Sequence, residues 1–134
     1  MAPPVLTVLT IEKCFSLLAT VPIGRVGLSV NALPVVLPVN FVVVDGDVVF
    51  RTVVGTKFHA AAAGAVVAFE ADGWAPSGQS GWSVAIQGQA EVVSDAAEIE
   101  RLAGLTSDSW ALDGAADRFV RIRAVSVTGR SFQR

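Results

Sequence analysis

Residues 48–64, VVFRTVVGTKFHAAAAG, join two patterns that belong to different secondary structures. The first half is an apolar run typical of a β-strand, interrupted only by Arg51-Thr52, and the second half is a block of alanines that favours a helix. Gly55-Thr56-Lys57 lies between them. The stretch therefore predicts a strand that turns at the glycine into a short helix, with two cations and two hydroxyls gathered around the turn.

The sequence on both sides of this stretch divides into strand-like segments in hairpin order. Asp45-Gly46 is a strong hairpin signal, Asn31-Ala32 marks another turn, and Gly88 indicates a bend or bulge inside a long strand. The predicted strands cover 24–30, 33–44, 47–54, 65–72, 82–93 and 118–130, and 73–81 is predicted to be a loop. Six strands with three small helices predict a mainly β fold, a closed antiparallel barrel.

The three predicted helices are short and peripheral. They cover 10–21, 56–63 and 95–105. Thr10 can cap the first one, and Cys14 lies on its apolar face, which predicts a buried, inert thiol.

Composition limits the class of protein. A chain of 134 residues fits one domain, 1–134, and 52% hydrophobic residues together with 12 glycines exceed the ordinary apolar share of about 45–50%. The excess predicts an oligomer interface or an apolar cofactor. A net charge of −2 argues against a nucleic-acid partner, and no apolar run is long enough to span a membrane. A single cysteine fits a reducing cytoplasm, and the N-terminus lacks the basic residues of a signal peptide.

Several kinds of catalytic site are disfavoured. One histidine and one cysteine make a zinc site very unexpected, and neither the phosphate-binding P-loop nor the nucleophile elbow of hydrolases is present. Glu70 and Asp72 share one strand face and could form an acid pair, although exposed strand-end acids are the simpler interpretation. His59 is interpreted as a surface or cap-region residue rather than a catalyst.

The strand-to-helix turn is the best candidate site. Free amides of a first helical turn, a hydroxyl, an ammonium group and a nearby guanidinium together suit a dianionic phosphate. The alternative is a capped helix with two solvated cations.

The order of segments across residues 14–130 resembles the pyridoxamine 5′-phosphate oxidase-like family of FMN-binding split barrels. The most telling parts are Pro38-Val39-Asn40-Phe41, the stretch from Arg51 to Gly55-Thr56-Lys57, and Gly81-Trp82-Ser83-Val84 leading to Gly88. The resemblance implies a six-stranded antiparallel split β-barrel that forms a homodimer with two flavins between the subunits.

The resemblance also implies roles for individual residues. Thr56 and Lys57 would hold the FMN phosphate after the turn at Gly55, with Arg51 or Thr52 beside them. Residues Pro38, Val39, Asn40 and Phe41 would border the isoalloxazine ring, and Trp82 and Ser83 would reach the flavin of the neighbouring subunit. The implied activity is flavin-dependent oxidation–reduction with a small-molecule electron donor or acceptor.

One departure from the family pattern and three alternatives stay open. The chain ends in TGRSFQR and lacks the C-terminal Arg-x-x-Arg-Leu segment for pyridoxal phosphate, so vitamin B6 oxidation is not expected; Arg130 is a partial stand-in. A deazaflavin would use a similar cationic cradle, and a non-catalytic flavin-binding protein would use the same site. A pure interaction module would present Arg121 and Arg123, on one strand face, to an acidic partner.

Overall fold

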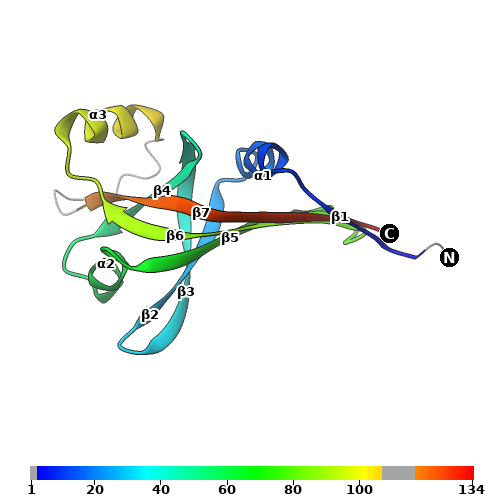
Figure 1. Ribbon diagram of the computed structural model, residues 1–134, viewed down its shortest axis with the longest axis horizontal. Helices are drawn as coiled ribbons and strands as arrows, with labels where there is room; N and C mark the ends of the chain where they lie inside the picture. The colour runs from blue at the N-terminus through cyan, green and yellow to red at the C-terminus, as the bar shows by residue number, and fades with distance from the viewer. Residues whose placement is uncertain (1–2, 107–116) are drawn as a thin grey trace.

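The computed structural model describes residues 3–106 and 117–134, apart from the side chains of Lys57 and Asp117. Among these residues the chain is mainly antiparallel β-sheet with three small helices (Figure 1). The strands are β1 (Val5–Val8), β2 (Ile23–Val30), β3 (Leu33–Val44), β4 (Asp47–Val53), β5 (Val66–Trp74), β6 (Ser80–Val92) and β7 (Asp117–Gln133). The helices are α1 (Ile11–Leu18), α2 (Lys57–Ala62) and α3 (Ala96–Leu105).

Six of these strands pair in a closed circuit. The sheet order is β1-β7-β4-β3-β2-β5-β6, and β6 also pairs with β7, so that β7 returns the sheet to its beginning. Every pairing is antiparallel. This is the connectivity expected of the predicted six-stranded barrel, and β1 is a seventh strand added to the outer edge of β7.

The two predicted hairpin turns are confirmed. Asn31 and Ala32 have φ values of 50° and 64°, and Asp45 and Gly46 have values of 52° and 78°. Two consecutive residues with positive φ are the mark of the type I′ turn, whose twist matches that of the strands it joins. These turns set the register of β2 with β3 and of β3 with β4.

The helix starts follow from their capping residues. The side-chain oxygen of Thr10 accepts from the Lys13 amide, that of Thr56 from the His59 amide, and that of Asp95 from the Glu98 amide. Each bond satisfies one amide that the first helical turn leaves without a partner. The predicted helix positions are therefore right to within a few residues.

Two apolar clusters hold the elements together. The larger fills the inside of the closed sheet, with Phe50, Phe69, Ile86 and Ile122 at no more than 1% exposure. The smaller lies on the other face of β4 and β7, where Leu102 of α3 is fully buried. In Figure 1, α3 and α1 lie above the long strands β6 and β7, and α2 lies below them at the left.

The structure corrects three predicted boundaries. The loop predicted over 73–81 is only a short connection, because β5 continues to Trp74 and β6 begins at Ser80. The last strand continues to Gln133 instead of ending at residue 130, and it pairs with β1, which the sequence did not predict. The described residues therefore form seven strands rather than the predicted six.

A membrane span is not found among the described helices, none of which is long and apolar enough to cross a bilayer.

The structure confirms the irregularity that the sequence predicts at Gly88. The register of β6 with β7 shifts between Gln87 and Gly88, and a Cβ at Gly88 would overlap the backbone carbonyl of Arg123. Gly88→Ala should therefore lower the free energy of unfolding by about 1–3 kcal/mol. The matched control is Gly104→Ala in α3, where a Cβ meets nothing within 4 Å and should stabilise the helix by about 0.5 kcal/mol. Urea unfolding of both variants measures the difference; equal stability of the two would contradict the close packing at Gly88.

Candidate functional site

The turn from β4 into α2 is built as a glycine turn followed by a capped helix. Gly55 has a φ of 92°, which glycine adopts without strain, and the space around its α-carbon is open. The Thr56 hydroxyl donates to the Val53 carbonyl oxygen at 2.7 Å and accepts from the His59 amide at 3.1 Å. The turn is thus held in shape by its own threonine and leaves the space beside Gly55 free.

Thr52 and His59 form a second link between β4 and α2. Thr52 is 3% exposed, and its Oγ1 lies 2.6 Å from Nδ1 of His59. His59 is half-buried, and its backbone amide donates to the capping hydroxyl of Thr56, so its interpretation as a cap-region residue is confirmed. The Thr52–His59 bond joins residues seven apart across a strand, a turn and a helix, and no local sequence pattern marks it. Thr52 therefore holds α2 against the barrel.

Arg51 points away from this link. Since neighbouring strand residues alternate, Arg51 lies on the outer face of β4, with its guanidinium 4.8 Å from the centre of the Phe119 ring. Ile99 and Ala103 of α3 lie beside it. The backbone of Lys57 begins α2, and its side chain falls outside the described residues.

The predicted β3 residues divide between the core and the outer face. Phe41 is buried, pairs with Phe50 of β4 and meets the Phe69 ring edge-on at 4.8 Å. Pro38 and Asn40 are exposed and point outward, and Val39 is half-buried against the core. Because Phe41 and Phe50 are a cross-strand pair with inward side chains, the residues next to them, Asn40 and Arg51, share the outer face of β3 and β4.

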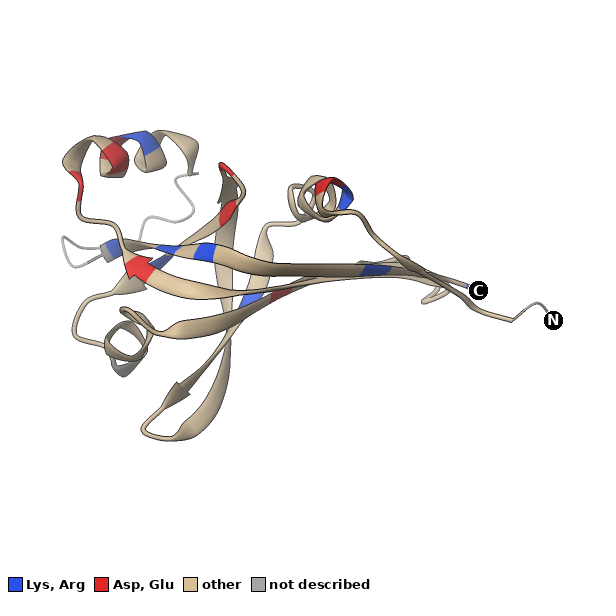
Figure 2. Ribbon diagram, in the orientation of Figure 1, with Lys and Arg blue, Asp and Glu red and all other residues tan. Residues whose placement is uncertain are grey.

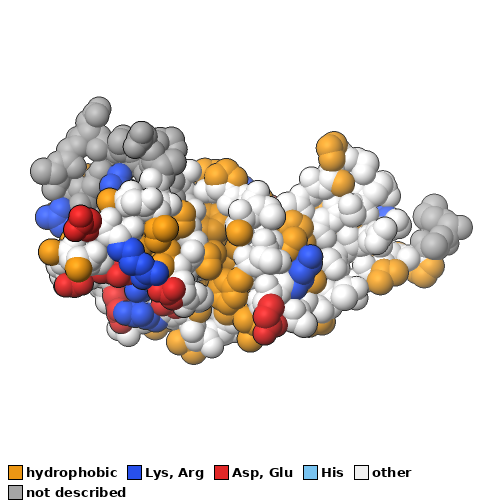
Figure 3. Space-filling view, turned by 90° about the horizontal axis from the view of Figure 1, so that it is seen from above, with side chains coloured by type: hydrophobic (Ala, Val, Ile, Leu, Met, Phe, Trp, Pro, Cys, Tyr) orange, Lys and Arg blue, Asp and Glu red, His pale blue; other side chains and the backbone are white. Residues whose placement is uncertain are grey.

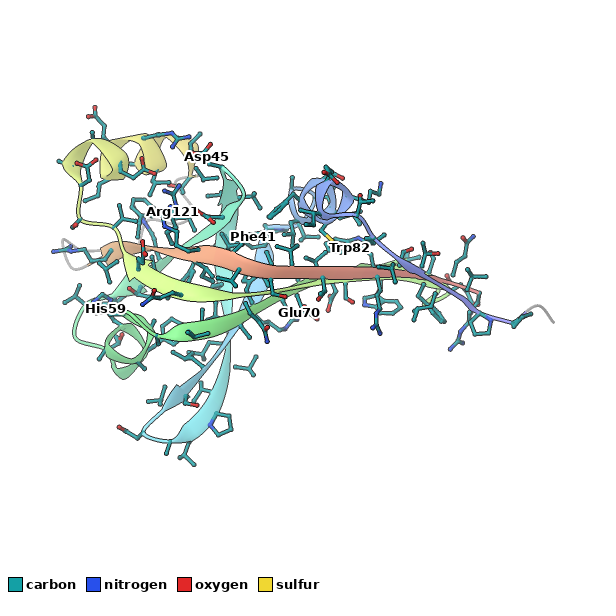
Figure 4. All side chains as sticks on the ribbon, viewed as in Figure 1. Phe41, Asp45, His59, Glu70, Trp82 and Arg121 are labelled. Atoms are coloured by element: carbon teal, nitrogen blue, oxygen red, sulfur yellow. The ribbon has the colours of Figure 1, made fainter. Side chains whose placement is uncertain are left out.

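Trp82 and Ser83 lie far from the turn along β6. Ala90, near the end of that strand, exchanges backbone hydrogen bonds with Gly64 and Ala65 just after α2. Trp82 precedes Ala90 by eight residues, which corresponds to about 26 Å of extended strand. Figure 4 places Trp82 beneath α1 and His59 at the opposite end of the molecule. A single chain therefore brings the β3 and β4 residues together and keeps Trp82 and Ser83 apart from them.

The two arginines considered for an acidic partner have partners inside the chain. Nη2 of Arg121 lies 3.2 Å from Oε1 of Glu98 in α3, and Arg123 lies 3.1 Å from Glu91 and 3.3 Å from Asp47. Arg121 is 9% exposed. Figure 2 shows these charges gathered where α3 meets the sheet. Arg121 therefore holds α3 on the sheet, and Arg123 links β7 to β4 and β6; their meeting an acidic partner stays a prediction.

Other candidate groups remain apart from the turn. Cys14 is buried as predicted, and burial raises the pKa of its thiol. Within residues 3–106 and 117–134, no three metal-ligating side chains come together.

Glu70 and Asp72 lie within β5, and Glu70 is not a simple solvated acid. Desolvation and, next, the neighbouring Asp72 raise the pKa of Glu70 to about 7, although Arg25 lies 3.9 Å from it and opposes the shift. Its Oε1 atom is buried without a hydrogen-bond donor. The Glu70 side chain is nevertheless 42% exposed, so it is a partly exposed acid on which Asp72 of the same strand face acts.

Comparison with known proteins gives consistent matches over nearly the whole chain. A family model described as pyridoxamine 5′-phosphate oxidase matches residues 10–131. Protein Rv0080 of Mycobacterium tuberculosis is 41% identical over 123 residues, which are 88% of this chain and 80% of that protein.

Two solved structures resemble the fold closely. The FAD binding protein from Mycobacterium smegmatis superposes with a TM-score of 0.75 at 32% identity, over 96% of this chain and all of that one. A candidate pyridoxamine 5′-phosphate oxidase from Corynebacterium glutamicum superposes with a TM-score of 0.83 at 29% identity, over 96% of this chain and 99% of that one.

The raised pKa of Glu70 predicts how stability depends on pH. An acid whose pKa is higher in the folded than in the unfolded chain contributes stability at low pH that is lost as pH rises. This loss of stability should occur between pH 4.5, the ordinary pKa of the group, and about pH 7, the pKa of Glu70 in the folded chain. Glu70→Gln should flatten the stability profile across this window, as measured by chemical unfolding at half-unit pH steps. An unchanged profile in the variant would mean that Glu70 titrates normally.

Proposed function

Because the chain belongs to the pyridoxamine 5′-phosphate oxidase family, we propose that it is a homodimeric flavoprotein that binds FMN at the β4–α2 turn and catalyses oxidation–reduction. The observation that carries the proposal is the turn itself, where open backbone at Gly55 adjoins Thr56 and Lys57 in a chain of this family. The name of the mycobacterial structure at 32% identity, a FAD binding protein, supports a flavin ligand.

The residues at the turn suit a flavin phosphate. Open space beside Gly55 admits an anion to the start of α2, and Lys57 supplies a positive charge there. Arg51, on the outer face next to Asn40, supplies a second charge on the path from the phosphate to the ring. FAD contains the FMN unit with its phosphate joined to AMP as a diphosphate, so both nucleotides present an anion to this turn, and only FMN presents it as a terminal dianion.

The chain's own residues hold and orient the cofactor. A flavin supplies hydride or single-electron transfer at its ring, and the protein binds the ring and tunes it. The Thr52–His59 bond fixes α2 to β4, which holds the phosphate end at a constant distance from β3. Pro38 and Asn40 then offer an outward surface for the ring, and Val39 and Phe41 anchor that surface to the core.

A second copy of the chain is part of the proposal. Trp82 and Ser83 do not approach the turn of their own chain, and two-fold symmetry lets them approach the turn of a partner. Apolar surface for such an interface is abundant: Val36 of the β2–β3 hairpin is 67% exposed and Val125 of β7 is 85% exposed. Figure 2 shows that the projecting end of the β2–β3 hairpin carries no charged side chain, and hydrophobic side chains run across the middle of the face in Figure 3.

The phosphate cradle predicts discrimination between FMN and riboflavin. Losing one charge-assisted contact of about 1.5–3 kcal/mol weakens binding by about 10- to 150-fold, so Lys57→Met should weaken FMN by that factor. Riboflavin has no phosphate, and its affinity should barely change. Flavin fluorescence quenching measures both ligands, with FAD and a deazaflavin phosphate as further ligands.

Lys13→Met is the matched control, because Lys13 is the other lysine of the chain and lies on α1, away from the turn. It should bind FMN as the parent does. Parental FMN affinity in Lys57→Met would instead mean that the turn is only a helix cap.

The shared site predicts complementation between two defective chains. Lys57→Met damages the cradle and Trp82→Ala damages the partner's contribution, so each homodimer alone should bind FMN weakly. After subunit exchange, half of the dimers are mixed and each mixed dimer has one intact site, so about a quarter of all sites should recover. FMN titration of the mixture, with mass measurement of the dimer, tests this. A stable monomer that binds FMN would exclude the shared site.

A further inference from the structure

The ends of three long strands project beyond the barrel as an arm. The arm consists of residues 71–74 of β5, 80–83 of β6 and 130–133 of β7, with β1 along its edge. In Figure 1 it extends to the right, with α1 above it. The opposite face of the arm has no helix over it among the described residues.

Two glycine–tryptophan pairs shape the arm. Gly73 pairs with Trp82 and Gly81 pairs with Trp74 across β5 and β6. A Cβ at Gly73 would lie 2.6 Å from Nε1 of Trp82, and one at Gly81 would overlap the ring of Trp74. Each indole therefore lies over the glycine opposite it. Because side chains alternate along a strand, Trp82 lies on the α1 face and Trp74 on the uncovered face.

The uncovered face contains a hollow with aromatic walls. One row across the sheet runs Leu6, Phe132, Gly81 and Trp74. The Trp74 and Phe132 rings are 6.2 Å apart between centroids and tilted by 54°, and the hollow has a volume of about 280 Å³. That volume suits a ligand of one or two rings.

The charges around this hollow all have one sign. Arg130 and Arg134 line it and no acidic residue does. Arg134 lies 5.3 Å from the centre of the Phe132 ring. Arg130 makes no ion pair within the described part of the chain, unlike Arg121 and Arg123.

Arg130 also has a polar neighbour on the same face. The next row of the sheet is Arg130, Ser83 and Asp72, in which Ser83 lies between the other two. Asp72 is two strands from Arg130, about 9.6 Å away, and does not line the hollow. A guanidinium and a hydroxyl side by side are suited to a carboxylate.

We propose that this hollow is a binding site for a small aromatic carboxylate, whose ring lies between Trp74 and Phe132 and whose carboxylate is bound by Arg130. The hollow lies apart from the phosphate cradle of its own chain, which is at the other end of β6. Trp82 and Ser83 also line the hollow, so in the proposed dimer it adjoins the partner subunit's flavin and gives that site a place for an anionic organic substrate; in this respect the inference rests on the proposed function. Apolar walls provide the affinity for the ring, and the cationic rim selects the anion over a neutral molecule of the same shape.

The test compares 2-naphthoate with 2-naphthamide, which has the same rings without the charge. The intact protein should bind the carboxylate about tenfold more tightly than the amide, measured by calorimetry in low salt. Raising the salt concentration should shrink this preference, because the rim is exposed. Arg130→Met should abolish the preference while leaving the amide affinity unchanged, and Arg130→Lys should retain part of it.

Lys13→Met is the control that shows which face of the arm binds the carboxylate. Lys13 lines a larger groove of about 510 Å³ on the α1 side, which shares Trp74, Trp82 and Phe132 with the hollow. The Lys13→Met variant should still prefer 2-naphthoate to 2-naphthamide. If Lys13→Met loses this preference and Arg130→Met keeps it, the anion binds in the other groove and the proposal is wrong. Equal affinities of the two compounds for the intact protein, or a preference unaffected by salt, would also overturn it.

A competition experiment separates this site from the proposed flavin site. With FMN at saturation, 2-naphthoate should still bind with its affinity unchanged or improved. Displacement of 2-naphthoate by FMN would mean that the hollow is part of the flavin site, and the proposal of a separate site would be wrong. Failure of FMN to bind at all, with the carboxylate preference intact, would contradict the flavin proposal alone.

Discussion

Strand β7 is the constraint on which the rest of the fold depends. Two of its residues pair with a strand on each side. Val120 pairs with Phe50 of β4 and Val92 of β6, and Ile122 pairs with Val48 of β4 and Ala90 of β6. Both side chains are fully buried inside the closed circuit. If β7 paired with only one neighbour, the sheet would stay open and its inner face would meet water. Closure also creates the outer face of β4 and β7, on which α3 packs.

Closure of the sheet requires local irregularities, which particular residues make possible. The β6–β7 pair runs through thirteen pairings, and a twisted pair of that length needs an irregularity to stay on a curved surface. Gly88 provides it, since a side chain there would overlap Arg123. Toward the end of the arm the Trp74 and Trp82 rings lie over Gly81 and Gly73, and Trp82 also packs against the larger apolar cluster.

The parts of the fold that the sequence predicts are those with local causes. Turn residues with positive φ, helix caps such as Thr10 and the glycine bulge act within a few residues, so the pattern alone indicates them. The arm has a different cause. Residues 73–81 have the composition of a loop. Gly73 and Trp74 are nevertheless strand because they pair with Trp82 and Gly81 of β6, and that part of β6 pairs in turn with β7, about fifty residues later. Strand β1 likewise depends on Arg130 to Gln133 at the other end of the chain.

The same distinction applies to the candidate site. The turn at Gly55 is a local feature, and its position in the chain was predictable. The direction of Arg51, the burial of Thr52 and its bond to His59 depend on which face of β4 is inside the closed sheet, which no short pattern states.

Ion pairing within the chain distinguishes Arg130 from four other arginines. Arg25, Arg101, Arg121 and Arg123 all have carboxylate partners within the chain, which makes their positions understandable without any ligand. Arg130 has none among the described residues; it pairs with Ser83 and lines the hollow to which Trp74 and Phe132 also contribute. Arg130 is exposed, so water solvates its guanidinium and folding alone does not require a carboxylate beside it. The same exposure leaves the guanidinium accessible to an anion at the hollow, which is the role we propose for it.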